Sequence, residues 1–259
     1  MLRLPRNLPR LLGLPMRGCR TSGRGVRWCT AALLLAGSVS TWAGVFTVTP
    51  VRMYMGPRDR ALALTVTNGG DAEMVLQAET FEWSQTADGQ DQLKPSDDLV
   101  LAPPIVKIPP RGRQVVRLAL VVPRDASRQM TYRIIMREVP EAAAPAASTV
   151  QVQMALAMNM PVFVTPAAAR RKLACSLSRK GNGLQARCTN EGSAYAQVRE
   201  LRVQRGNQPL ARFEGGSYIL PGASRVLDLK AEQAIAAGAV TLAVRFDDST
   251  ETTTELALP

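Results

Sequence analysis

Residues 149–165 read TVQVQMALAMNMPVFVT, and this stretch is the most informative about the fold. Every second residue from 150 to 160 is large and apolar, a set that we call the even-numbered row: Val150, Val152, Met154, Leu156, Met158 and Met160. A period of two is the spacing at which side chains of a β-strand share one face. At ~3.3 Å per residue, a strand over 149–164 spans roughly 50 Å, which is longer than most strands of globular proteins.

This stretch has two interpretations that the residues alone leave open. The row packs inside its own sandwich, as an alternating strand usually does, or part of it is presented to another chain. A strand of this length either changes sheets midway, for which Pro161 is a plausible bend, or presents part of itself to something else. Its length and the limit that Pro161 places on ladder hydrogen bonding favour presentation. No residue from 148 to 165 is charged, although charge is what soluble proteins normally use to protect an exposed strand edge.

Shorter strand-like runs continue on both sides of this stretch, from residue 45 to the end. Turn dipeptides such as Asp88-Gly89, Gly206-Asn207 and Pro221-Gly222 separate them, which is typical of antiparallel β architecture. Helical periodicity is weak, and its best segment is 231–237. The other expected strands are 45–51, 61–68, 73–83, 99–101, 105–108, 114–122, 131–138, 173–179, 184–189, 195–204, 209–213, 224–229, 239–246 and 251–258.

The number of strands predicts two domains. About fifteen strands are too many for one immunoglobulin-like sandwich of seven to nine, but they suit two. The junction is expected near residues 165–171 (TPAAARR), where the long apolar strand ends at a proline and small residues. We therefore predict an all-β fold with immunoglobulin-like β-sandwich domains at 44–165 and 166–259.

Residues 1–43 have the three parts of a secretory signal. An arginine-rich stretch reaches Arg27, an apolar stretch runs from Cys29 to Ala36, and small residues lead to Ala43. The apolar run is shorter than the roughly 20 residues that a membrane span needs. We therefore predict export and cleavage after Ala43; the start codon stays open between Met1 and Met16.

Composition excludes several functions. The net charge of +11 owes seven charges to arginines of residues 1–43, which contain no acidic residue, so it does not indicate nucleic-acid binding. The chain has no histidine, which excludes a Ser-His-Asp triad and a His-ligated zinc or haem site. The acidic loop 88–91 lacks the ligand series of a calcium site. We predict no cofactor, no metal and no enzymatic activity.

Two cysteines remain beyond the leader, Cys175 and Cys188. They flank Gly181-Asn182-Gly183, a strong hairpin signal. With Gly181-Asn182 as a two-residue loop, the two cysteines lie directly opposite each other, close enough for a bridge. Because an exported protein meets an oxidising compartment, we favour a disulfide over two unrelated thiols.

Fragments in a consistent order and spacing give the chain a family resemblance. It resembles the periplasmic pilus-assembly chaperones of the chaperone–usher systems over nearly its whole length after the leader. The matching fragments are TPVR (49–52), LTVTN (64–68), FEW (81–83), LKPSDDL (93–99), APP (102–104), IPP (108–110), QVVRL (114–118), YRIIMREVP (132–140), PVFVTP (161–166) and YILPG (218–222).

The resemblance implies a boomerang of two immunoglobulin-like domains with a cleft between them, in the periplasm. Such a chaperone lends its long last strand to a pilin subunit that lacks one, and delivers the subunit to an outer-membrane usher. On the positions that match the donor strand, the inserted residues here are Val150, Val152, Met154 and Leu156.

The resemblance also implies two basic residues in the cleft that grip the subunit's C-terminal carboxylate. Arg52 matches the first. The second is usually a lysine on the donor strand, but its position here is Pro161, so the chain is closer to divergent members of the family. We propose Arg133, on the preceding strand, as the substitute. The alternative for either arginine is a solvated surface charge.

Two other functions remain open at this stage. A structural subunit of a surface fibre would normally have an N-terminal donor extension and an incomplete sandwich, whereas Val45 enters a strand almost at once. An exported β-sandwich enzyme or binding module would need stacked aromatics or paired acids in a cleft. Whether the free chaperone self-associates to cover its row is also open.

Overall fold

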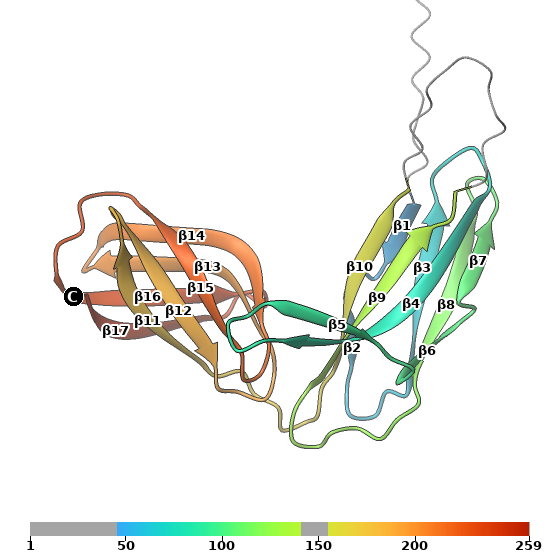
Figure 1. Cartoon of the computed structure of the whole chain (residues 1–259), viewed down its shortest axis with the longest axis horizontal. Helices are drawn as coiled ribbons and strands as arrows, with labels where there is room; N and C mark the ends of the chain where they lie inside the picture. The colour runs from blue at the N-terminus through green and yellow to red at the C-terminus, as the bar shows by residue number, and fades with distance from the viewer. Residues whose placement is uncertain (1–45, 141–154, 259) are drawn as a thin grey trace, which may run out of the picture. The chain divides into compact units, whose positions relative to one another are not determined.

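The computed structural model describes residues 46–140 and 155–258, and every regular element within them is a β-strand (Figure 1). The strands build two sandwiches, which confirms the predicted all-β fold. The predicted leader 1–43 and three members of the even-numbered row, Val150, Val152 and Met154, lie outside the described residues. No helix in the described chain is both long and apolar enough to span a membrane.

The first sandwich consists of β1 (Phe46–Thr49), β2 (Met53–Met55), β3 (Ala61–Asn68), β4 (Met74–Gln85), β5 (Asp91–Pro95), β6 (Leu99–Ala102), β7 (Ile105–Ile108), β8 (Arg113–Leu120), β9 (Met130–Glu138) and β10 (Ala157–Val164). One sheet has the order β1-β3-β8-β6; the other has the order β2-β10-β9-β4-β5, with β7 also paired to β4. Alternating side chains from both sheets, such as Val66, Leu118, Ile134 and Val162, form one buried core.

The first predicted strand, 45–51, ends early at β1, and the short strand β2, which the sequence analysis did not predict, follows it in the other sheet. β1 pairs with β3 in one sheet, whereas β2 pairs with β10 in the other. Residues 50–52 make the crossing, and Pro50 explains where it starts, because a proline has no N–H to donate to a ladder. The expectation of one strand over 45–51 is therefore wrong in its last residues, and Arg52 lies at the crossing.

β10 is the described part of the informative stretch. It runs antiparallel to β9, with Met160 opposite Ile134 and Pro161 opposite Arg133. Met160, Val162 and Val164 face the core. Phe163 faces the other side of the sheet, as alternation requires. The predicted strand over 149–164 is too long at residues 155 and 156, which precede β10 and are not part of a strand.

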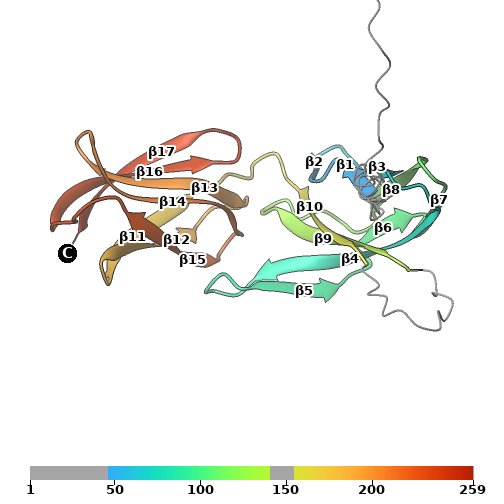
Figure 2. The same cartoon turned by 90° about the horizontal axis from the view of Figure 1, so that it is seen from above.

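The second sandwich consists of β11 (Leu173–Lys180), β12 (Gly183–Asn190), β13 (Ala196–Arg205), β14 (Gln208–Ile219), β15 (Ser224–Ala231), β16 (Gly238–Phe246) and β17 (Glu251–Leu258). Their order is β11-β12-β15-β14-β13-β16-β17. β14 and β15 pair at only two positions, Ala211 with Ala231 and Arg212 with Lys230. The two ends of this sheet therefore separate into layers (Figure 2), which enclose a single core.

The hairpin β11–β12 confirms the predicted register and the disulfide. Cys175 pairs with Cys188 in the ladder, and a disulfide joins them. Gly181 in the turn has a φ of 54°, a left-handed conformation that glycine adopts without strain. A two-residue turn and strand alternation therefore suffice to place the two thiols together.

Three other strand predictions differ from the structure. β5 was not expected, because its residues are all exposed and show no apolar alternation. β14 continues to Ile219, well beyond the expected end at 213, through Gly215-Gly216. The segment 231–237 is not helical; β15 includes its first residue and bends follow.

Candidate functional site

Five aromatic side chains gather where the two sandwiches meet, within the compact unit Ala43–Pro259. Trp83 on β4 and Phe163 on β10 come from the outward face of the first sandwich. Tyr195 and Tyr218 come from the second sandwich and pack against them. The rings of Phe163 and Tyr195 are stacked with centroids 4.0 Å apart, and Trp83 meets Tyr218 edge to face at 5.2 Å. Tyr54 on β2 stacks on Phe163 at 5.6 Å.

Arg133 lies inside this cluster because of the register of β9. It is the ladder neighbour of Pro161, the position at which the sequence departs from the expected lysine. Its guanidinium lies over the Trp83 ring, 3.6 Å from the centroid, and 5.5 Å from the centroid of Tyr218. Burial lowers the pKa of this guanidinium, although the charges of Asp91 and Tyr218 oppose the shift.

The guanidinium of Arg133 has no anionic partner within the described chain: no hydrogen bond or ion pair joins it to residues 46–140 or 155–258. A half-buried arginine usually has a carboxylate partner, because an unpaired charge is costly to desolvate. Here the aromatic faces of Trp83 and Tyr218 provide partial compensation by cation–π attraction. The donors of Arg133 are therefore available to an anion.

Arg52 also lies near the Tyr218 ring. Its guanidinium is 5.8 Å from the Tyr218 centroid, so the structure brings the two predicted arginines to one ring. In contrast to Arg133, its Nη1 bonds the Oδ2 atom of Asp247 at 2.9 Å. Burial lowers the pKa of Arg52, but Tyr54, Tyr218 and Asp247 together outweigh burial and raise it.

Two tyrosine hydroxyls extend the hydrogen bonding of this ion pair. The Tyr195 hydroxyl donates to Asp247 at 2.8 Å and lies 3.0 Å from the Tyr54 hydroxyl, so the Tyr54 hydroxyl donates to that of Tyr195. Burial is the largest reason why the pKa of Tyr195 is raised, and these two hydrogen bonds add to it. Arg52, Tyr54, Tyr195 and Asp247 line a pocket of about 430 Å³. Within this pocket, Arg52 forms its ion pair with Asp247.

Two glutamines that the sequence analysis did not single out join the sandwiches at this place. Gln85 donates from Nε2 to the Tyr218 carbonyl at 3.1 Å and accepts from the Leu220 N–H at 2.8 Å. The buried Gln129 donates its N–H to the Ser193 carbonyl at 2.8 Å and accepts from the Tyr195 N–H at 2.9 Å. Each glutamine therefore satisfies backbone groups as a neighbouring strand would.

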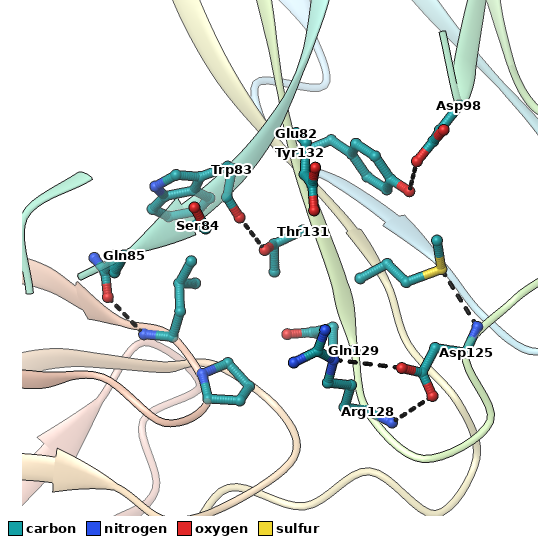
Figure 3. Close-up of a pocket in the computed structure, with 13 residues that line it drawn as sticks. Glu82, Trp83, Ser84, Gln85, Asp98, Asp125, Arg128, Gln129, Thr131 and Tyr132 are labelled. Carbon is teal, nitrogen blue, oxygen red and sulfur yellow. Dashed lines mark hydrogen bonds and ion pairs between the residues drawn. The ribbon is translucent and has the colours of Figure 1, made fainter. Parts of the chain in front are cut away.

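Figure 3 shows a further cavity, of about 300 Å³, lined by β4, the start of β9 and Leu220. Two of its three carboxylates, Asp98 and Asp125, already have partners. Asp98 accepts from the Tyr132 hydroxyl at 2.9 Å, and Asp125 pairs with Arg128 at 3.3 Å. Burial, followed by the bond to Asp98, raises the pKa of Tyr132. The acidic lining disfavours an anion here and leaves the two arginines as the anion-binding candidates.

The described end of the even-numbered row leaves the core of the first sandwich. Met160 is 1% exposed, Met158 is partly buried against the core, and Leu156 is 39% exposed. Leu156 still follows the register of β10, since its carbonyl accepts from the Glu138 N–H at 2.9 Å. The row thus passes from buried to exposed as the chain is followed towards residue 155.

One backbone edge of β10 is also open. β2 pairs with Val162, Phe163 and Val164 only, so within the described ranges no strand pairs with that edge of residues 157–161. An open strand edge next to an exposed apolar row is the geometry that strand addition uses. Within the described ranges, no cluster of three metal-ligand side chains occurs.

Comparisons with known proteins agree with this geometry. The model of the N-terminal domain of pili and flagellar-assembly chaperones matches residues 45–170. The uncharacterized fimbrial chaperone YbgP of Escherichia coli (strain K12) is 27% identical over an alignment of 143 residues, and the match covers 51% of this chain and 56% of that protein. The match thus spans little more than half the length of this curated relative.

Solved structures share the fold. A chain of the CsuC–CsuE chaperone–tip adhesion subunit pre-assembly complex of Acinetobacter baumannii aligns with a TM-score of 0.60 at 17% identity, covering 83% of this chain and 99% of that one. The E. coli chaperone DraB aligns with a TM-score of 0.53 at 19% identity, covering 83% and 95%. Both likenesses support two immunoglobulin-like sandwiches.

Proposed function

The chain belongs to the pili and flagellar-assembly chaperone family through its N-terminal domain, and from this premise we propose that it binds pilin subunits by donor-strand complementation. In this proposal the protein works in the periplasm after removal of residues 1–43 and delivers each subunit to an outer-membrane usher. Val150, Val152, Met154 and Leu156 enter the subunit, and Arg52 with Arg133 grips its C-terminal carboxylate.

The observation that carries the proposal is the exit of the even-numbered row from its own core beside an open strand edge. A row that served only its own sandwich would stay buried, whereas Leu156 is already 39% exposed. A client strand on the open edge of β10 gains ladder hydrogen bonds, and the row fills the gap in the client's core.

Magnitudes indicate which contact supplies the affinity. Burying four large apolar side chains stabilises the complex by roughly 6–12 kcal/mol as an upper bound. A hydrogen bond between an arginine and a carboxylate adds only about 1.5–3 kcal/mol. The carboxylate grip nevertheless fixes the register, because a one-residue slip turns every side chain of the row to the wrong face.

Alternation supplies a matched test. The double variant Met154→Asp/Leu156→Asp places two charges on the row, whereas Gln153→Asp/Ala155→Asp places two charges on the opposite face of the same segment. Each variant is co-expressed with a fimbrial subunit of the same organism, and the one-to-one complex is measured by co-purification and size-exclusion chromatography.

We expect the first variant to abolish the complex and the second to retain it. Both variants should unfold at the temperature of the wild type, because Ala155 and Leu156 are exposed and, in this proposal, the rest of the segment serves the client. Equal capture by the two variants, whether retained or lost, would refute presentation of the row.

A further inference from the structure

We propose that Asp247 is a stand-in for the client's terminal carboxylate: it holds Arg52 until a subunit arrives, and because a client carboxylate has to displace it, it moderates the preference of the site for a free carboxylate over a neutral end. This inference rests on the proposed function and adds a specificity-determining residue to it. In this proposal the client carboxylate binds first to Arg133. It then binds to Arg52, where it replaces Asp247.

The position of Asp247 is fixed by its turn. It follows β16 in the tight connection to β17, where the Phe246 N–H donates to the Thr250 carbonyl at 2.9 Å. The side chain is only 10% exposed, and one oxygen, Oδ2, accepts from both Arg52 and Tyr195. A carboxylate held in this way presents to Arg52 the same group that a chain terminus would present.

The two arginines both lie near the Tyr218 ring, but only Arg52 is hydrogen-bonded to a carboxylate. Arg133 stacks on Trp83 and has no carboxylate partner among the described residues, whereas the Arg52 side chain is 31% exposed and engaged by Asp247. An incoming carboxylate therefore binds Arg133 without displacing a hydrogen-bonded carboxylate, although the charge of Asp91 also acts on this guanidinium. To reach Arg52 it must displace Asp247, and it replaces one charge-assisted hydrogen bond by another.

The exchange limits how strongly the site prefers a carboxylate, because only a carboxylate breaks the pair between Asp247 and Arg52 in order to bind. A neutral group, such as a backbone carbonyl or a C-terminal amide, forms a bond of about half the strength of the charged one and does not displace Asp247. A free carboxylate does displace it. The stand-in also avoids a second unpaired cation in a partly desolvated place, which would be costly in the free protein.

The alternative is that Asp247 only orients the two sandwiches. Gln85 and Gln129 already join them through four hydrogen bonds to backbone groups, and Phe163 stacks on Tyr195. A purely orienting role predicts that loss of the Asp247 charge weakens every client equally. A stand-in role predicts that it changes the preference for a carboxylate over an amide.

The experiment compares two peptides that copy the last strand of the co-purifying subunit, one with a free C-terminal carboxylate and one with a C-terminal amide. Their affinities are measured by titration calorimetry for the wild type, Asp247→Asn and Asp248→Asn. Asparagine keeps an oxygen that accepts from the Tyr195 hydroxyl. Asp248 is the matched control, because it is the next residue in the same turn but pairs with Arg171.

We expect Asp247→Asn to raise the acid-to-amide affinity ratio about three- to tenfold, since a charged partner of Arg52 becomes a neutral one at a partly exposed site. Asp248→Asn should leave the ratio unchanged. An unchanged or lower ratio in Asp247→Asn, or an equal rise in Asp248→Asn, overturns the stand-in role and leaves the proposed function intact. A wild type that binds neither peptide, or both equally, contradicts the carboxylate grip itself.

Discussion

Replacement of Arg133 by alanine should separate client capture from stability. The guanidinium is available to a client carboxylate, and charged hydrogen bonds of this kind contribute about 1.5–3 kcal/mol. Because every 1.4 kcal/mol is a factor of about ten in an equilibrium constant, Arg133→Ala should weaken subunit capture about tenfold or more. Arg133→Lys should be intermediate, because lysine keeps the charge but loses the planar fork and the stacking on Trp83.

The same substitution should change stability little. Loss of the cation–π contact with Trp83 costs about 0.5–2 kcal/mol, but removal of a desolvated, unpaired charge offsets this cost. We therefore expect the free energy of unfolding to change by less than about 1 kcal/mol, the difference left between these two opposing effects.

Arg137→Ala provides the control on the same strand and the same face. Arg137 is exposed and pairs with Glu79 at the surface, and such pairs contribute about 0–1 kcal/mol. Capture is measured by calorimetry with the purified subunit, and stability by urea unfolding followed through Trp83 fluorescence in protein lacking residues 1–43. A large loss of stability in Arg133→Ala, with capture no weaker than in Arg137→Ala, would refute the anchor assignment.

Two other predictions concern stability. Cys175→Ser/Cys188→Ser opens a loop whose ends are 13 residues apart, so the free energy of unfolding should fall by about 3 kcal/mol in urea titrations; a change close to zero would contradict this. On the basic side, the folded-state pKa of Tyr195 is raised above its ordinary value of 10.0 by burial, then by its bonds to Tyr54 and Asp247. The unfolded chain therefore ionises first, and the contribution of this residue to stability is complete below about pH 10 and is lost as the pH rises further. The melting temperature of Tyr195→Phe should accordingly fall less steeply than that of the wild type between about pH 9 and pH 11, and parallel slopes would count against the assignment.

Strand alternation decided most of the fold from the sequence. It predicted the hairpin that pairs Cys175 with Cys188, and it assigned Met160 and Val162 to one face. It failed for β5, because an entirely exposed strand has no buried face and leaves no periodic pattern. It failed at Pro50, because the chain changes sheets there and the buried positions shift from even-numbered residues in β1 to odd-numbered residues in β2.

The sequence by itself thus determined the two sandwiches, the disulfide and the apolar row, since each depends on neighbours within one strand or one hairpin. Only the tertiary structure decided that Arg133 lies over Trp83 with no hydrogen-bonded carboxylate among residues 46–140 and 155–258, and that Arg52 is held by Asp247, a residue 195 positions away. The periodicity of a strand predicts which face a side chain occupies, but it does not predict which residues pack against that face. The packing of two separate sandwiches selects those partners, and for this reason one arginine is open and the other is occupied.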